Sequence, residues 1–323
     1  LMLLDTSINM AMQPFKMMVG DMVNEKQKGL AYSIQSFLCN AGSLAGYLFP
    51  FIFAAIGISN IAPKGVIPDS VIYSFYIGAL ILILCVIYTS VKVKEYPPKL
   101  YAEYHGIKDE KKGEKVNMLQ LLIKAPKAFW TVGLVQFFCW AAFLFMWTYS
   151  NGAIATQCFS WDGVNTAAEA FQTAGNWVGV CFAIQAVGSM LWALIMPTLE
   201  KYFHNKGAYA ISLVVGALGF ISTLFVTNQF VLLVSYAFIG AAWAAMLAVP
   251  FTILTNSLKG DNMGYYLGLF NCTICLPQIV AALIGGSILK YICAGSQVGM
   301  LVAAGILLIL GAISVVLIKE GKK

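Results

Sequence analysis

The sequence contains no arginine, only two histidines and few charged residues of any kind. Charged residues make up 11% of the 323 residues, against about 25% in an ordinary soluble domain. His105 and His204 lie in or beside polar segments, so no histidine cluster is available for a metal site or a catalytic triad. A glycine-rich phosphate loop of the Walker type is also missing, which argues against direct use of ATP. We therefore expect neither an enzyme nor a bound cofactor.

The residues that are abundant are apolar: hydrophobic residues make up 60% of the chain, and its mean hydropathy is +0.79. This composition is typical of a polytopic, all-α membrane protein. The net charge of +6 does not indicate a nucleic-acid partner, because the lysines lie in short connections beside apolar segments. The eight cysteines lie mostly within apolar segments and show no disulfide-framework spacing.

A membrane-spanning helix needs about 20 mostly apolar residues. By that criterion the sequence predicts nine spanning segments, at residues 1–23, 29–57, 70–94, 127–151, 174–199, 207–227, 229–256, 263–291 and 297–318. Lysines follow the first, third, fifth, seventh and last of these segments, whereas the other connections contain few. Under the positive-inside rule, the C-terminus is cytoplasmic and the protein is a multi-pass protein of the inner (plasma) membrane.

A charged loop at 95–126 divides the segments into three before it and six after it. Two six-helix halves joined by a long cytoplasmic loop are the layout of major facilitator transporters. We therefore expect residues 1–94 to be the last three helices of the N-terminal bundle, and 127–323 to be the six-helix C-terminal bundle. The layout predicts three further helices before Leu1. The loop itself is either a solvated linker or a segment that binds anionic lipid heads.

Polar residues share one face of the first segment. At about 100° per residue, Asp5, Asn9 and Lys16 lie on the same side of a helix. Ionisable groups inside a membrane usually face a cavity or a partner charge and mark a transport pathway. We expect Asp5 to couple transport to protons, Asn9 to bind sugar hydroxyls, and Lys16 to form a gate or pair with an acid. The alternative for Asp5 is an exposed position at a helix end. Asp21 faces away from this stripe, and either caps a neighbouring helix or joins a cytoplasmic gate.

A second stripe, on the first segment after the loop, combines amides with indole rings: Gln136, Trp140, Trp147 and Asn151. Aromatic faces beside amides suit a sugar, which presents apolar C–H faces and a rim of hydroxyl groups. The alternative is a belt of aromatic residues at the membrane interface.

Two later segments repeat the theme more weakly. Trp243 and Pro250 are seven residues apart, and so are Asn271 and Gln278. An amide without a partner in hydrocarbon costs several kcal/mol, so we expect Asn271 and Gln278 to contact substrate. The alternative for all four residues is a role in helix packing and bending.

Three stretches of sequence resemble one known group. "LDTSINMAMQPFKMMVGD", "QFFCWAAFLFMWTYS" and "GAAWAAMLAVPFTIL" are similar to the fourth, seventh and tenth helices of the sucrose/maltose–proton symporter family. "GYYLGLFNCTICLPQIVAALIGG" is similar to its eleventh helix. This family belongs to the major facilitator superfamily and is close to the glycoside–pentoside–hexuronide:cation symporters.

The resemblance implies uptake of a disaccharide coupled to protons or sodium, with Asp5 as the coupling acid. Lys16 stands where the family usually has arginine, so a bidentate ion pair is not expected there. The expected partners are a sugar, protons or sodium, and the lipid bilayer. A major facilitator carrier for a lipid or drug-like substrate, and a non-transporting truncated membrane protein, are the alternatives.

Overall fold

The computed structural model describes residues 2–24, 26–58, 67, 69–94, 97, 100, 118–163, 169–258 and 263–318, and most of these residues are helical. No strand occurs in these ranges. The helices are α1 (Met2–Met22), α2 (Lys28–Ala55), α3 (Asp69–Lys92), α5 (Met118–Ile123), α6 (Lys127–Phe159), α7 (Glu169–Ser222), α8 (Gln229–Ser257), α9 (Met263–Phe270), α10 (Cys272–Ser287), η1 (Ile288–Ile292), α11 (Gln297–Ser314) and η2 (Val315–Leu317). Most of the charged loop lies outside the described residues.

Helices cover all nine of the predicted segments. In the described part of the chain, six helices are long and apolar enough to cross a membrane: α3, α6, α7, α8, the stretch from α9 to η1, and α11 with η2. The more polar helices α1 and α2 are not among the six. The chain is thus an α-helical membrane protein. Several boundaries were predicted wrongly. Helix α6 continues past residue 151 to Phe159, and α7 begins at Glu169 and ends at Ser222 where 174 and 227 were predicted.

The long helix α7 consists of two antiparallel halves, which agrees with the two segments predicted in this region. His204 interrupts it with a non-helical conformation, φ 57° and ψ 172°. The Trp192 indole N–H donates to the Ser212 hydroxyl at 2.8 Å, which joins the two halves near the break. Farther from the break, the indole N–H of Trp177, near the start of α7, donates to the carbonyl of Gln229, the first residue of α8, at 3.2 Å. The chain therefore folds back on itself at His204.

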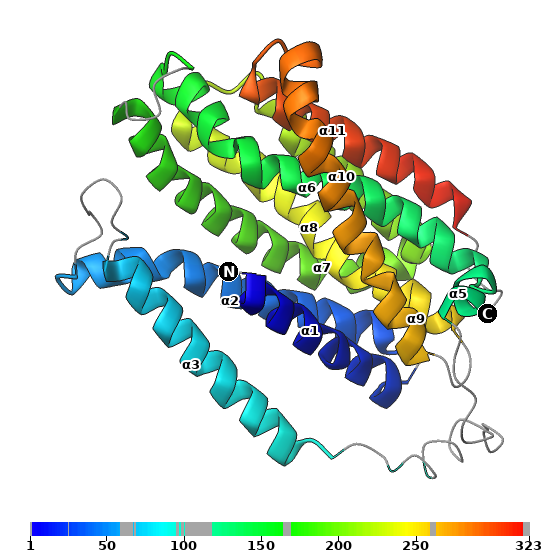
Figure 1. Cartoon of the computed structure of the whole chain (residues 1–323). Coiled ribbons are helices and arrows are strands. Elements are labelled where there is room, and N and C mark those ends of the chain that lie inside the picture. Colours follow the sequence, from blue (N-terminus) through cyan, green and yellow to red (C-terminus); the bar gives the residue numbers. More distant parts are fainter. Residues whose placement is uncertain are drawn as a thin grey trace.

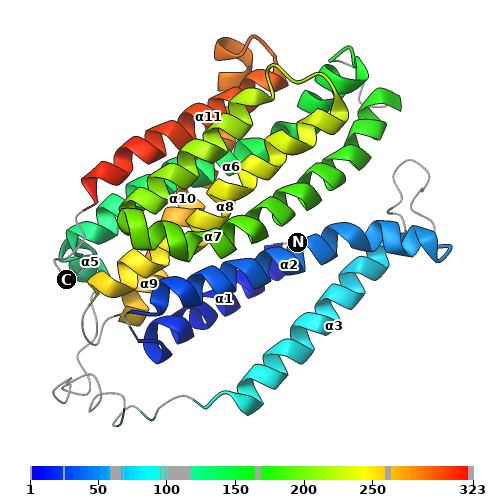
Figure 2. The ribbon, with the colours of Figure 1, turned by 180° about the vertical axis from the view of Figure 1, so that it is seen from behind.

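The core lies among the helices that follow the charged loop. In Figures 1 and 2, α6, α7, α8 and α11 run roughly along one direction, and α2 lies across one side of them. Helix α8 packs against α2, α6 and α7. Its residues from 240 to 255 are buried at nearly every position and include many alanines. Small side chains let neighbouring helices approach closely, which is the usual way that membrane helices pack.

Gly240 marks the closest approach of α7 and α8. A Cβ atom there would overlap the Gln185 carbonyl oxygen and would lie 2.6 Å from the Ser189 backbone nitrogen. On the opposite side of the contact, a Cβ atom at Gly188 would overlap the Ala237 carbonyl oxygen. Because these neighbours are backbone atoms, they cannot move aside as a flexible side chain would.

Helix α3 stands apart from the rest of the bundle. Figure 1 shows it leaving the far end of α2 and running away from the other helices. A ring contact between Phe53 and Tyr73, with centroids 6.4 Å apart, joins it to α2. Ser70 is its only buried residue, and its many large apolar side chains are exposed. An apolar helix of this kind is suited to contact with lipid or with other membrane helices.

All eight cysteines are free thiols, and all eight lie within the described residues. Cys139 and Cys181 are buried, whereas Cys39, Cys85, Cys272 and Cys275 are exposed. This agrees with the absence of a disulfide spacing in the sequence. The fold is therefore held together by helix packing.

We expect Gly240→Ala to lower the stability of the folded protein by about 1–3 kcal/mol, the usual cost of overpacking a close contact. Gly286→Ala is the matched control, because a Cβ atom at Gly286 meets nothing within 4 Å. Thermal unfolding of the detergent-purified chain measures the difference. Equal melting temperatures for the two variants would contradict the close crossing.

Candidate functional site

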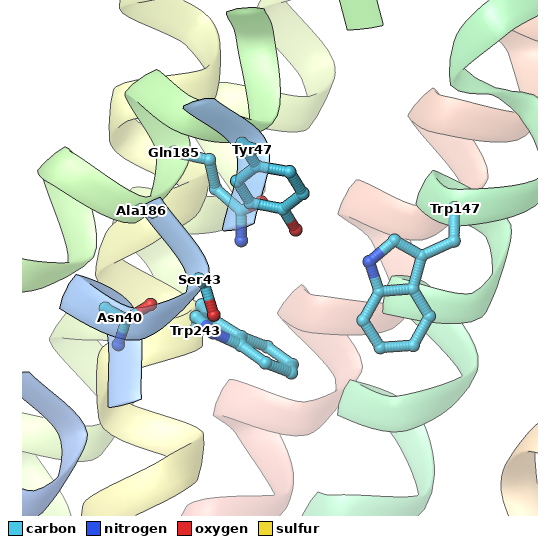
Figure 3. A pocket seen from close by; sticks show the side chains of 7 residues that line it. All are labelled: Asn40, Ser43, Tyr47, Trp147, Gln185, Ala186 and Trp243. Atoms are coloured by element: carbon cyan, nitrogen blue, oxygen red, sulfur yellow. The ribbon is translucent and has the colours of Figure 1, made fainter. Parts of the chain in front are cut away.

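A pocket lies where α2 meets α6, α7 and α8 (Figure 3). It holds about 280 Å³ of space between the helices, a figure that includes space open to solvent. Its lining combines amide, hydroxyl and phenol groups with two indole rings: Asn40, Ser43, Tyr47, Trp147, Gln185, Ala186 and Trp243. Because α2 precedes the charged loop and the other helices follow it, the pocket joins the two parts of the chain.

A polar stripe on α2 forms one wall of this pocket. Its members recur every three or four residues, as expected for one face of a helix: Ser33, Ser36, Asn40, Ser43 and Tyr47. The sequence analysis missed this stripe, although its spacing is visible in the sequence. Single serines in apolar helices are common, and it is their regular repeat with Asn40 and Tyr47 that distinguishes the stripe.

Hydrogen bonds hold part of the stripe in place. The Ser36 hydroxyl donates to the Ala244 carbonyl of α8 at 3.3 Å. The Asn40 side-chain N–H donates to the Ser36 carbonyl of its own helix at 2.7 Å. The Ser43 hydroxyl similarly donates to the carbonyl of Cys39 at 3.2 Å. The stripe is thus fixed both to α2 itself and to α8.

Two tryptophans, Trp147 and Trp243, form the aromatic side of the pocket, and a third, Trp140, packs on both of them. The Trp243 ring lies 5.7 Å from the Trp147 ring and 5.6 Å from the Trp140 ring, edge to face in both cases. Phe143 packs behind Trp243, with ring centroids 4.9 Å apart. Figure 3 shows the Trp147 indole nitrogen and the Tyr47 hydroxyl pointing into the pocket from opposite sides.

Two polar atoms at this site have no hydrogen-bond partner among the described residues. They are the side-chain oxygen of Asn40, a residue only 1% exposed, and the indole nitrogen of Trp140, which is 8% exposed. A buried polar group without a partner costs about 1–3 kcal/mol. Such groups are rare in folded proteins, and each one is open to a partner such as a water molecule or an ion.

The second predicted stripe is only partly at the pocket. Trp147 lines it, and Trp140 packs on both of its tryptophans. Gln136 is fully buried, donates to the Met246 carbonyl at 3.4 Å and accepts a bond from the Tyr209 hydroxyl at 3.2 Å. Its amide is therefore used in packing α6 against α7 and α8. Asn151 lies farther along α6, and its oxygen has no partner in the described part of the chain.

Asn271 and Gln278 do not line the pocket. Asn271 separates α9 from α10, and its amide N–H lies 4.0 Å from the Cys275 sulfur. The Gln278 amide N–H donates to the Ile274 carbonyl of its own helix at 3.1 Å. Their contact with a substrate remains a prediction.

The first predicted stripe is described in part. Asp5 and Asn9 lie in α1, but their side chains are outside what the structure describes. Asp21 lies at the end of α1 and is half-buried. Lys16 is 7% exposed, and its ammonium group lies over the Phe251 ring of α8, 4.0 Å from the ring centroid. Lys16 thus joins α1 to α8 through a cation–π contact, and its predicted part in a gate remains a prediction.

Other contacts surround Lys16 at the same end of the molecule. The Tyr32 hydroxyl donates to the Lys16 carbonyl at 3.2 Å, and its ring lies 6.0 Å from Phe251. The Glu200 carboxylate of α7 lies directly against Gly29, in the first turn of α2. A carboxylate is favourable at the positive end of a helix dipole. We name these contacts, of Lys16, Gly29, Tyr32, Glu200 and Phe251, the closed end.

No model of a known protein family matches the chain, and no curated protein matches it significantly. The chemistry of the pocket is what supports a function. None of its seven lining residues carries a charge. Amides, hydroxyls and indole faces without a charge suit a neutral ligand that has both hydroxyl groups and an apolar face.

The contact between Lys16 and Phe251 predicts a measurable coupling. We expect Phe251→Leu to destabilise the protein by about 1–2 kcal/mol more when Lys16 is present than when it is replaced by methionine, because a buried ammonium loses its aromatic face. Melting curves of the single variants and of the double variant give this difference. Additive effects of the two substitutions would refute the cation–π contact.

Proposed function

We propose that the chain belongs to a cation-coupled secondary transporter of the major facilitator type, which takes up a sugar of the disaccharide class. The observation that carries the proposal is the neutral, tryptophan-lined pocket at the junction of residues 1–94 with residues 127–323. In transporters built from two helical halves, substrate binds between the halves near the middle of the membrane. The resemblance of the sequence to sucrose/maltose–proton symporters supports the same function.

The contacts between the two parts of the chain support alternating access. The closed end lies on one side of the pocket, and the Ser36–Ala244 bond lies between them. On the other side, Tyr47 meets Phe182 with ring centroids 5.9 Å apart, and farther along α2 Ile52 is half exposed. With the orientation that the lysines indicate, the closed end faces the cytoplasm. Rocking the two halves would break its contacts and open the pocket to that side.

The pocket favours a sugar over the lipid or drug-like substrate that the sequence left open. A lipid carrier needs a wide apolar cleft, whereas Asn40, Ser43, Tyr47 and Gln185 bring polar groups to this lining. Amide and hydroxyl groups placed around indole faces match the hydroxyl rim and the C–H face of a sugar ring.

Binding of maltose or sucrose to the purified chain tests the proposal. We expect one of the two to bind, and Trp147→Ala to weaken its binding about tenfold, equivalent to ~1.4 kcal/mol, through loss of an aromatic contact. Trp130→Ala, on the same helix α6 but at an exposed position, should leave the affinity unchanged. Isothermal titration calorimetry measures both. If neither maltose nor sucrose gives a heat of binding, the sugar assignment is wrong. Binding of lipid-like compounds instead would favour the alternative carrier.

The coupling role of Asp5 has its own test. In the full-length protein, we expect Asp5→Asn to abolish uphill uptake driven by a proton gradient while leaving exchange of sugar across the membrane, because the variant cannot take up and release a proton. Asp69→Asn, at the exposed start of α3, is the control. Uptake of labelled sugar by proteoliposomes gives both rates. Undiminished uphill uptake by Asp5→Asn would refute the coupling role.

A further inference from the structure

Two buried polar groups, one on α2 at the pocket and one on α7 a turn away from it, have no partner among the described residues. One is the side-chain oxygen of Asn40, and the other is the hydroxyl of Ser189, which is 0% exposed. Asn40 already uses its N–H groups on the Ser36 carbonyl, so its oxygen is left as an acceptor. Ser189 lies one helical turn after Gln185, which lines the pocket. Neither residue was singled out by the sequence.

The register of α2 against α7 places the two residues at the same level. Tyr47 contacts Phe182, and Gly29 contacts Glu200, so the two helices run antiparallel. Gly29 and Tyr47 are separated by the same number of residues as Phe182 and Glu200. Counting seven residues inward from the Tyr47–Phe182 contact on each helix leads to residue 40 of α2 and residue 189 of α7. Asn40 and Ser189 therefore lie at the same level along the two helices.

Contacts with α8 hold both Asn40 and Ser189 in position. The Ser189 backbone lies against Gly240 of α8, so the position of Ser189 is set by the closest helix crossing in the bundle. Asn40 is held by Ser36, which is itself bonded to α8.

We propose that Asn40 and Ser189 form a subsite that binds one hydroxyl group of the substrate, a reading that rests on the proposed sugar transport. A hydroxyl both donates and accepts a hydrogen bond. The substrate hydroxyl donates to the Asn40 oxygen and accepts from the Ser189 hydroxyl. The subsite thereby joins α2 to α7 through the substrate, and it selects for a sugar that carries a hydroxyl at one particular ring position.

Specificity of this kind is strong, because a substrate without the hydroxyl leaves both buried groups unpaired. Sites that hydrogen-bond a particular hydroxyl reject analogues that lack it far more effectively than apolar pockets reject an extra methylene. The subsite therefore predicts that removing one sugar hydroxyl weakens binding much more than removing any of the others.

The test measures affinities of maltose, sucrose and their monodeoxy derivatives for the purified chain by calorimetry. We expect one monodeoxy derivative of the sugar that binds to lose at least about tenfold in affinity. Asn40→Ala and Ser189→Ala should each bind the parent sugar about tenfold more weakly than the original chain does. Each variant should bind the parent sugar and that monodeoxy derivative with equal affinity. Ser74→Ala is the matched control, because Ser74 lies on α3 outside the pocket and its hydroxyl is bonded to the Ser70 carbonyl; this variant should keep the full discrimination.

The outcomes separate the subsite from the proposed function. If a sugar binds but both alanine variants discriminate as the original chain does, the two groups have only a structural role and the subsite is wrong, while sugar binding stands. If neither sugar binds to the original chain, the proposed function and the subsite fail together. The two variants act on different helices, so loss of folding in one leaves the other as an independent test.

Discussion

At Gly188 and Gly240 the backbones of α7 and α8 approach each other more closely than any side chain would permit. This crossing determines the geometry around the pocket. Trp243 lies one turn beyond Gly240 on α8, and Gln185 lies on the turn of α7 that Gly240 touches. An indole ring and an amide are thereby brought to the same level. Helix α2 packs on both helices and completes the pocket with its polar stripe.

The need to pair buried polar groups separates packing residues from candidate binding residues. Gln136 and Tyr209 are fully buried and bonded to each other, and Ser212 accepts a bond from the Trp192 indole. Such fully paired groups stabilise one arrangement of helices and have no capacity left for a ligand. Asn40 and Ser189 are equally buried but each keeps an unused atom. Burial alone would not distinguish the two kinds of residue.

Much of the fold follows from the sequence, because long apolar runs separated by lysine-rich connections fix where helices begin and end. The break at His204 was also foreseen, since Lys201 and Lys206 interrupt the apolar run. The site was predicted less well. Trp147 lines the pocket as expected from its stripe, but Gln136, on the same predicted face, turns to Met246 and Tyr209 instead.

The reason is that a helical face is wide, and the neighbouring helices decide which part of it meets another helix and which part meets a cavity. Periodicity places residues on a common face but does not say what that face contacts. The stripe on α2 illustrates the opposite error, in which residues at the pocket were not predicted to be there. Its residues are small and only moderately polar, so each one alone resembles an ordinary packing residue, and only contact with α7 and α8 reveals their common wall.

The chemistry of the closed end also bears on the proposed transport cycle. A buried ion pair is costly to separate, about 3–5 kcal/mol when one charge loses its partner. A cation–π contact, like that of Lys16 with Phe251, contributes about 2 kcal/mol when it is desolvated. The Lys16–Phe251 contact therefore breaks at a lower free-energy cost than a buried ion pair would. A transporter must break and remake these contacts in every cycle, so moderate strength is an advantage. In the proposed transporter, lysine at position 16 suits reversible opening, because a lysine cannot form the bidentate pairing with a carboxylate that an arginine forms.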